Sequence, residues 1–393
     1  MHAGERVLTA IRAIAAALLV FTGSSADPVR EQQQWVLDAL NVEQAWTVTK
    51  GAGVTVAVVD SGVDGEIKEL KGRVTAGPDM TSGSVVRGMP PGKHGTAMAG
   101  LIAASGEDDG LIGVAPEARI LSLPMVTDDD PGIEFGVPPM QDEEMASESP
   151  LARALRYAAN HGAKVVSMSI GSYGPLKSER EAVSYALGKG VVLVAAVGND
   201  GQSGYARDKG TSYWSFPAGY PGVIGVAATD KQGKKAPFSS DNLSVLVAAP
   251  GVGVPVVKRK SGYELSQGTS SAAALVAGVA ALVKSRYPAL PPEQVAQALS
   301  MSARGRPATG YDDQTGFGVV DAAAALNAAE RLTGVQRSVP ASGKEHFGQG
   351  EDSPVPARPG PDPWHLWVYG GGVLIALITF CGAIIVLHQR KEE

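Results

Sequence analysis

The chain has 393 residues, of which 44% are hydrophobic and 19% are charged, and this composition excludes a highly charged disordered polymer. The 34 basic and 40 acidic residues give a formal net charge of −6, which argues against nucleic-acid binding. The single cysteine, Cys381, excludes an intramolecular disulfide and a thiolate metal cluster. A chain of this length is expected to form about two to three domains, stabilised by core burial.

The amino-terminal segment has the pattern of an export signal. Arg6 and Arg12 precede the apolar stretch 14–21, and small residues follow as far as Ala26. We therefore predict a signal peptide over 1–26 that is cleaved after Ala26. An uncleaved anchor helix is the alternative, although the apolar stretch is shorter than the roughly 20 residues that a bilayer requires.

The region 27–334 alternates short β-branched runs with longer alanine-rich stretches. The short runs are almost entirely apolar, as expected for strands that are covered on both faces. This alternation predicts an α/β domain with a mostly parallel central sheet between helical layers. The predicted strands are 54–59, 118–123, 164–170, 191–197 and 223–228, and the predicted helices are 95–104, 151–160, 178–189, 270–286 and 292–301.

Three residues suited to acyl transfer stand at the ends of these predicted elements. Asp60 follows the first strand, His94 precedes the helix 95–104, and Ser270 opens the helix 270–286. A serine that attacks, a histidine that takes its proton and a carboxylate that orients the imidazole form a nucleophilic triad. A histidine at a helix start is more often structural. The prediction that His94 is a base therefore depends on Asp60 and Ser270 as its partners. The other histidines lie in the terminal segments, the linker or a helix end: His2, His161, His346, His365 and His388.

Three short motifs surround these residues: Asp-Ser-Gly at 60–62, His-Gly-Thr at 94–96 and Gly-Thr-Ser at 268–270. In their order and spacing they resemble the motifs of the subtilisin-like serine peptidases, and the resemblance covers roughly 34–326. It implies a subtilisin-like three-layer fold and serine endopeptidase activity, with Ser270 as nucleophile, His94 as general base and Asp60 as the orienting carboxylate. We predict neither a cofactor nor a catalytic metal.

A fourth segment, 195–201, resembles the oxyanion segment of that family. The resemblance implies that the side chain of Asn199 and the backbone N–H of Ser270 donate hydrogen bonds to the negative oxygen of the tetrahedral intermediate. Loss of one such donor typically lowers the rate about a hundredfold to a thousandfold. A plain turn residue is the alternative for Asn199.

Two further segments resemble the walls of the substrate cleft, and a third segment places Ser215 at the floor of the specificity pocket. An extended substrate would pair with one wall through its backbone, without regard to sequence. Plain core strand is the alternative for each segment. The predicted substrate-binding residues are Ser169, Ile170, Gly171, Ala196, Val197 and Gly198.

The insertion 127–150 contains eight acidic residues and no lysine or arginine. We expect a mobile, solvated loop. A loop that docks a partner or gates the cleft is the alternative hypothesis. Calcium binding is conceivable, but no ligand spacing in the insertion identifies it.

The carboxyl-terminal region predicts a membrane anchor. A segment rich in Pro, Gly, Ser and charge, 335–363, suits a solvated linker. The segment 364–388 begins with aromatic residues and carries an uncharged run, 368–387, that is long enough for one transmembrane helix. Basic residues in the short tail 389–393 place that tail in the cytoplasm and the catalytic domain outside it. A buried core helix is the alternative.

This architecture is similar to that of the mycosins, which are membrane-bound actinobacterial peptidases associated with type VII secretion. Mycosins often carry disulfides, which this chain cannot form. The similarity implies a membrane-anchored, extracytoplasmic serine endopeptidase that cleaves polypeptides, among them substrates or components of a secretion system. The alternatives are a mainly structural subunit of a secretion complex and a general degradative enzyme.

Overall fold

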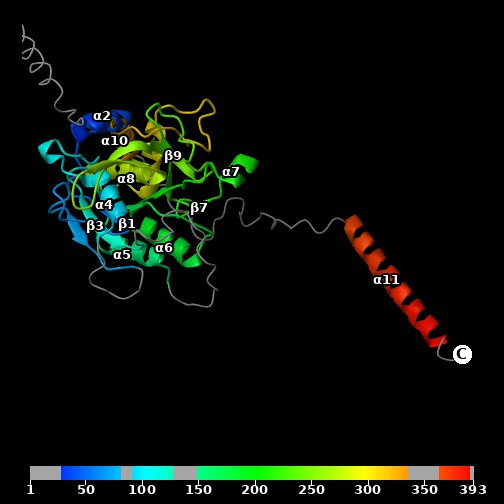
Figure 1. Ribbon diagram of the computed structural model, residues 1–393. Coiled ribbons are helices and arrows are strands. Elements are labelled where there is room, and N and C mark those ends of the chain that lie inside the picture. The colour runs from blue at the N-terminus through cyan, green and yellow to red at the C-terminus, as the bar shows by residue number, and fades with distance from the viewer. Residues whose placement is uncertain (1–27, 81–90, 127–147, 335–362, 390–393) are drawn as a thin grey trace, which may run out of the picture. The chain divides into compact units, whose positions relative to one another are not determined.

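The computed structural model describes residues 28–80, 91–126, 148–334 and 363–389 (Figure 1). The chain divides into two units, Met1–Val335 and Gln336–Glu393, and each is described by itself. The predicted signal peptide (1–26) lies outside the described residues. So do most of the acidic insertion (127–150), nearly all of the linker (335–363) and most of the tail (389–393).

A parallel sheet forms the centre of the first unit. Within the described residues it has seven strands in the order β2-β3-β1-β4-β6-β8-β9, and every neighbouring pair is parallel. The five predicted strands all belong to this sheet, so the prediction of a mostly parallel α/β fold is confirmed. Its strands are β1 (Thr55–Asp60), β2 (Val74–Ala76), β3 (Arg119–Pro124), β4 (Val165–Met168), β6 (Val192–Ala196), β8 (Ile224–Thr229) and β9 (Val245–Pro250).

Helices cover both faces of the sheet. Successive side chains of a strand point to opposite faces, so an apolar strand has an apolar surface to bury on each face. Val56 and Val58 of β1 belong to the core beneath α4 and α8, whereas Ala57 and Val59 belong to the core beneath α5 and α6. Figure 1 shows α8 and α4 on one side of the sheet and α5 and α6 on the other. The helices are α2 (Val29–Ala39), α3 (Val42–Trp46), α4 (Lys93–Ala103), α5 (Pro150–Asn160), α6 (Lys177–Gly188), α7 (Gly204–Lys209), α8 (Thr269–Arg286), α9 (Pro292–Ser302) and α10 (Ala322–Leu332).

Two small antiparallel pairs complete the first unit near the ends of the main strands. β5 (Ser172–Tyr173) pairs with β7 (Ser215–Phe216). β10 (Val252–Val257) and β11 (Tyr263–Gln267) form a hairpin that leads directly into α8. The alanine-rich α8 is buried along most of its length because its small side chains allow close packing against the sheet.

The second unit contains α11 (Pro363–Gln389). Its side chains are described at residue 364 and over 367–382, where most of them are exposed. Within the described part of the chain, no helix combines the length and hydropathy that crossing a membrane requires.

Candidate active site

Asp60 and His94 form a hydrogen-bonded pair at the carboxyl end of the sheet. Asp60 is the last residue of β1 and is fully buried, and His94 lies in the first turn of α4. His94 Nδ1 lies 2.8 Å from Asp60 Oδ1 and 3.0 Å from Oδ2. The His94 side chain is 25% exposed, so solvent reaches the imidazole but not the carboxylate of Asp60. A carboxylate at Nδ1 favours the tautomer that carries its proton on Nδ1, and this is the tautomer that the predicted role of Nε2 as general base requires.

The glycine in His-Gly-Thr permits this close approach of helix and strand. A Cβ on Gly95 would collide with the Gly62 carbonyl oxygen and lie 3.2 Å from Asp60 Cβ. The backbone N–H of Gly95 donates to Ser61 Oγ at 3.1 Å, and the Asp60 carboxylate accepts the Ser61 N–H at 2.7 Å. The two motifs therefore bind each other directly, and this fixes His94 above the strand end.

Ser270 reaches the same edge through the sheet order. β1 neighbours β4 and β4 neighbours β6, so the segments after these strands emerge side by side, and α8 packs across them. Ser270 Oγ donates to the Ser169 carbonyl oxygen at 3.4 Å, and Ser169 Oγ donates to the Ser270 carbonyl oxygen at 3.2 Å. These two contacts tie the start of α8 to the end of β4.

Asn199 stands beside Ser270 with its amide oriented by Thr269. Asn199 Oδ1 accepts both the backbone N–H and the hydroxyl of Thr269, each at 3.0 Å. The ideal Cβ position on Gly268 lies 3.6 Å from Asn199 Nδ2 and 3.8 Å from Ser270 N. Because one point beside Gly268 is close to both nitrogens, the two predicted oxyanion donors border the same space. Thr269 was not among the predicted site residues, although it lies within the Gly-Thr-Ser motif.

The predicted substrate walls follow the neighbouring strands β4 and β6. Ser169 and Ile170 are almost completely buried after β4, and Gly171 is half-buried. Ala196 and Val197 are fully buried in the two hydrophobic cores, one on each face of the sheet. The side chains of Ala196 and Val197 therefore pack inward, and their segment can meet a substrate through its backbone. The substrate-binding roles stay predictions.

An aromatic group next to the predicted substrate wall 169–171 was not predicted. Tyr205 and Tyr213 stack with ring centroids 3.7 Å apart, and Tyr173 meets Tyr213 edge-on at 5.7 Å. Burial, followed by a hydrogen bond to Asp200, raises the pKa of Tyr173 far above its usual value. Tyr173 belongs to β5, which continues from the predicted wall, and Asp200 follows Asn199. Sequence alone offers only separate tyrosines, because the edge-on contact of Tyr173 with Tyr213 depends on the pairing of β5 with β7.

A buried hydroxyl lies directly after the predicted nucleophile Ser270. This residue, Ser271, is fully buried. Its hydroxyl lies 2.8 Å from Ser266 Oγ at the end of β11, so the buried polar group is satisfied. Within the described residues, no group of His, Cys, Asp or Glu side chains could hold a metal ion.

Comparisons with known proteins agree with this geometry. The subtilase family model matches residues 51–318. Fervidolysin from Fervidobacterium pennivorans is 36% identical over 324 residues, which cover 74% of this chain but only 43% of fervidolysin. Mycosin-3 from Mycobacterium tuberculosis is 31% identical, over 90% of this chain and 83% of mycosin-3. The solved structure of the MycP3 protease from the type VII (ESX-3) secretion system is 32% identical, with a TM-score of 0.60 over 74% of this chain and 87% of MycP3.

Proposed function

The chain belongs to the subtilase family of serine peptidases, and we propose that it is a membrane-anchored endopeptidase that acts outside the cytoplasm. The observation that carries the catalytic part is the pairing of Asp60 with His94 at the sheet edge where Ser270 and Asn199 also lie. A buried carboxylate that binds an accessible imidazole is the arrangement that a nucleophilic serine requires.

The proposed reaction passes through an acyl-enzyme. Ser270 Oγ attacks the scissile carbonyl carbon while His94 Nε2 accepts the hydroxyl proton, and Asp60 stabilises the imidazolium that forms. Asn199 Nδ2 and the Ser270 N–H donate to the developing oxyanion. His94 then gives its proton to the leaving amine. Water, activated by the same imidazole, hydrolyses the ester bond to Ser270.

We propose that the polypeptide substrate lies extended along 169–171. A strand-like substrate receives its affinity from backbone hydrogen bonds, so cleavage depends weakly on most side chains. The aromatic group at Tyr173, Tyr205 and Tyr213 borders this path. It suits contact with apolar or aromatic substrate side chains.

The proposal of a membrane location is based on the sequence. The apolar stretch 14–21 after Arg6 and Arg12 supports export, and the uncharged run 368–387 supports a single transmembrane helix. The basic residues that follow this run support a cytoplasmic tail and an extracytoplasmic catalytic domain.

We further propose that the substrates are proteins or components of a type VII secretion system. Mycosin-3 matches 90% of this chain, and the MycP3 protease is described as belonging to such a system. A mainly structural role in a secretion complex is the alternative, and it predicts that the complex needs the protein but not its nucleophile.

A fluorophosphonate probe on the full chain tests the catalytic proposal. We expect labelling of the wild type and no labelling of Ser270→Ala. The matched control is Ser271→Ala, which removes the neighbouring hydroxyl and should keep most of the labelling. An unlabelled wild type, or equal labelling of Ser270→Ala, would contradict the proposal.

The same variant separates the enzymatic role from the structural one in cells. If secretion substrates lose their processing in Ser270→Ala, the enzymatic role is supported. If deletion of the protein abolishes secretion while Ser270→Ala leaves both secretion and processing intact, the structural role replaces it.

A further inference from the structure

A cavity of about 500 Å³ lies at the amino ends of β2 and β3, at the opposite edge of the sheet from the catalytic residues. Arg119 lines it and opens β3, where it pairs in register with Thr55 at the start of β1. Asp60 stands at the other end of β1. At about 3.3 Å per residue, the cavity and the catalytic carboxylate are roughly 17 Å apart along the strand.

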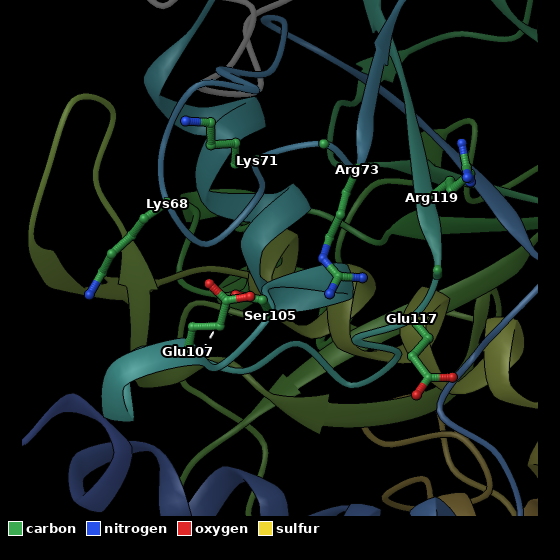
Figure 2. A pocket seen from close by; sticks show the side chains of 9 residues that line it. Lys68, Lys71, Arg73, Ser105, Glu107, Glu117 and Arg119 are labelled. Atoms are coloured by element: carbon green, nitrogen blue, oxygen red, sulfur yellow. Dashed lines mark hydrogen bonds between the residues drawn. The ribbon is translucent and has the colours of Figure 1, made fainter.

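The lining of the cavity is mainly basic. Figure 2 shows the Arg73 side chain extending from the start of β2 toward Ser105 and Glu117. The four cations and two carboxylates of the lining give it a formal charge of +2. Three of the four cationic residues are well exposed, and Arg73 is half-buried. The charged residues of the lining are Lys68, Lys71, Arg73, Arg119, Glu107 and Glu117.

These cations are available to a partner. Within the described part of the chain, none of the four has an ion pair or a side-chain hydrogen bond, although two carboxylates share the cavity. No contact among the residues that the structure describes therefore uses their charge. Clustered like charges repel one another and are stabilised when an anionic group binds among them.

We propose that this cavity is a docking site for an acidic polypeptide segment of a partner protein. Its concave shape does not match the flat surface of a bilayer. Its volume is greater than a single phosphate group needs, and it suits a few residues of an extended chain. Glu107 and Glu117 would repel a compact, multiply charged anion, but they can accept backbone N–H groups of a peptide whose carboxylates meet the cations.

Docking at the amino edge leaves the substrate cleft open. The partner holds the enzyme through one edge of the sheet while peptide cleavage proceeds at the other. This function does not depend on catalysis, so the docking proposal and the peptidase proposal can fail separately.

Binding of a fluorescent peptide rich in Asp and Glu tests the proposal. The full chain carries Ser270→Ala so that the peptide stays intact, and it is held in phosphatidylcholine nanodiscs. We expect fluorescence anisotropy to show saturable binding that weakens steeply when ionic strength rises from about 0.05 M to about 0.5 M. Lys68→Glu with Lys71→Glu should weaken binding about tenfold. Glu117→Gln should strengthen binding, because its amide oxygen can still accept a peptide N–H while the charge that repels the acidic side chains is removed.

The matched control carries Lys177→Glu and Lys209→Glu, two exposed lysines on α6 and α7 that change the net charge equally. This control should bind the peptide like the parent. Equal weakening in both double variants would show attraction to the whole molecule and overturn the proposal, as would absence of peptide binding. Binding of phosphatidylglycerol vesicles in place of the peptide, with the same sensitivity to Lys68→Glu and Lys71→Glu, would assign the cavity to lipid instead. Cleavage of an uncharged peptide by the same variants with Ser270 intact should be unchanged.

Discussion

At the carboxyl edge of the central sheet the reactive groups are held firmly: Asp60 is fully buried and lies 2.8 Å from His94 Nδ1. At the amino edge of the same sheet, Lys68 and Lys71 are exposed, and no described group pairs with their ammonium groups. The difference between the paired and the unpaired charges matches the role that we propose for each edge. Catalysis needs donors and acceptors whose geometry is fixed before the substrate arrives, whereas recognition through charge needs groups that remain free to pair.

The largest expected effect tests whether the carboxyl edge depends on orientation of the imidazole. Asp60→Asn replaces the buried acceptor with an amide of the same shape and favours the wrong tautomer of His94. We expect kcat to fall about 10⁴-fold with little change in KM. Steady-state cleavage of a peptide substrate measures both constants. A fall of less than tenfold would show that the pair is structural.

The next effect concerns the oxyanion donor. Asn199→Ala removes the amide that Thr269 orients, and we expect kcat to fall about a hundredfold to a thousandfold while KM stays near the parent value. Thr269→Val is a useful comparison, because it removes one of the two bonds to Asn199 Oδ1 and keeps the backbone bond. Its loss should be smaller. A rise in KM with unchanged kcat in Asn199→Ala would instead assign Asn199 to substrate binding.

A stability measurement sharpens the contrast between paired and unpaired cations. The Arg30 guanidinium donates to the carbonyl oxygens of Gly110 at 2.7 Å and Gly106 at 3.1 Å, beside the cavity residue Glu107. Arg30→Ala leaves these carbonyls without the charged donor, and we expect it to lower the free energy of unfolding by about 1–3 kcal/mol.

Lys71→Ala, in contrast, should change stability by less than about 0.5 kcal/mol. Urea unfolding of the full chain compares the two variants. If Lys71→Ala destabilised the protein as much as Arg30→Ala, the amino-edge cations would be structural.

The smallest effect concerns pH and a second buried carboxyl, Glu179 in the first turn of α6. Burial raises its pKa, against the lowering effect of hydrogen bonds from Tyr220 Oη at 2.8 Å and Ser149 Oγ at 3.0 Å. Glu179 therefore binds its proton more tightly in the folded protein than in the unfolded chain. The stability that this group contributes is complete below its pKa in the unfolded chain and is lost as pH rises through the raised pKa of the folded state.

The test measures the free energy of unfolding of the parent and of Glu179→Gln over the pH interval between the pKa of Glu179 in the unfolded chain and its raised pKa in the folded protein. The variant should lose this part of the pH dependence. An identical pH profile in the two proteins would show that the pKa of Glu179 is not raised.

Sequence predicted the main strands because each is a compact apolar run, and the structure confirms all five. It did not predict β2, which is only three residues long, Val74–Ala76, and carries no periodic pattern. It also did not predict β9, because Val245–Pro250 is followed by the β10–β11 hairpin and not directly by a helix, so the strand-helix alternation breaks there.

The residues of the candidate site that lie in short sequence motifs could be predicted. Asp60, His94 and Ser270 could be found because each motif pairs a reactive residue with glycines that the close packing requires, as Gly95 shows. The orientation of Asn199 by Thr269 and the aromatic group around Tyr213 could not be predicted, since they form only when distant loops meet. The basic cavity was also missed, because its lining comes from three separate segments.

The reactive groups come from parts of the chain that are far apart in sequence. The Asp60–His94 contact spans 34 positions, the Asn199–Thr269 contact spans 70, and the Ser169–Ser270 contact spans 101. Each must be closed against chain entropy, so the complete constellation exists only after α8 has docked on a finished sheet. We therefore expect a nascent or partly unfolded molecule to lack peptidase activity until α8 has docked on the sheet.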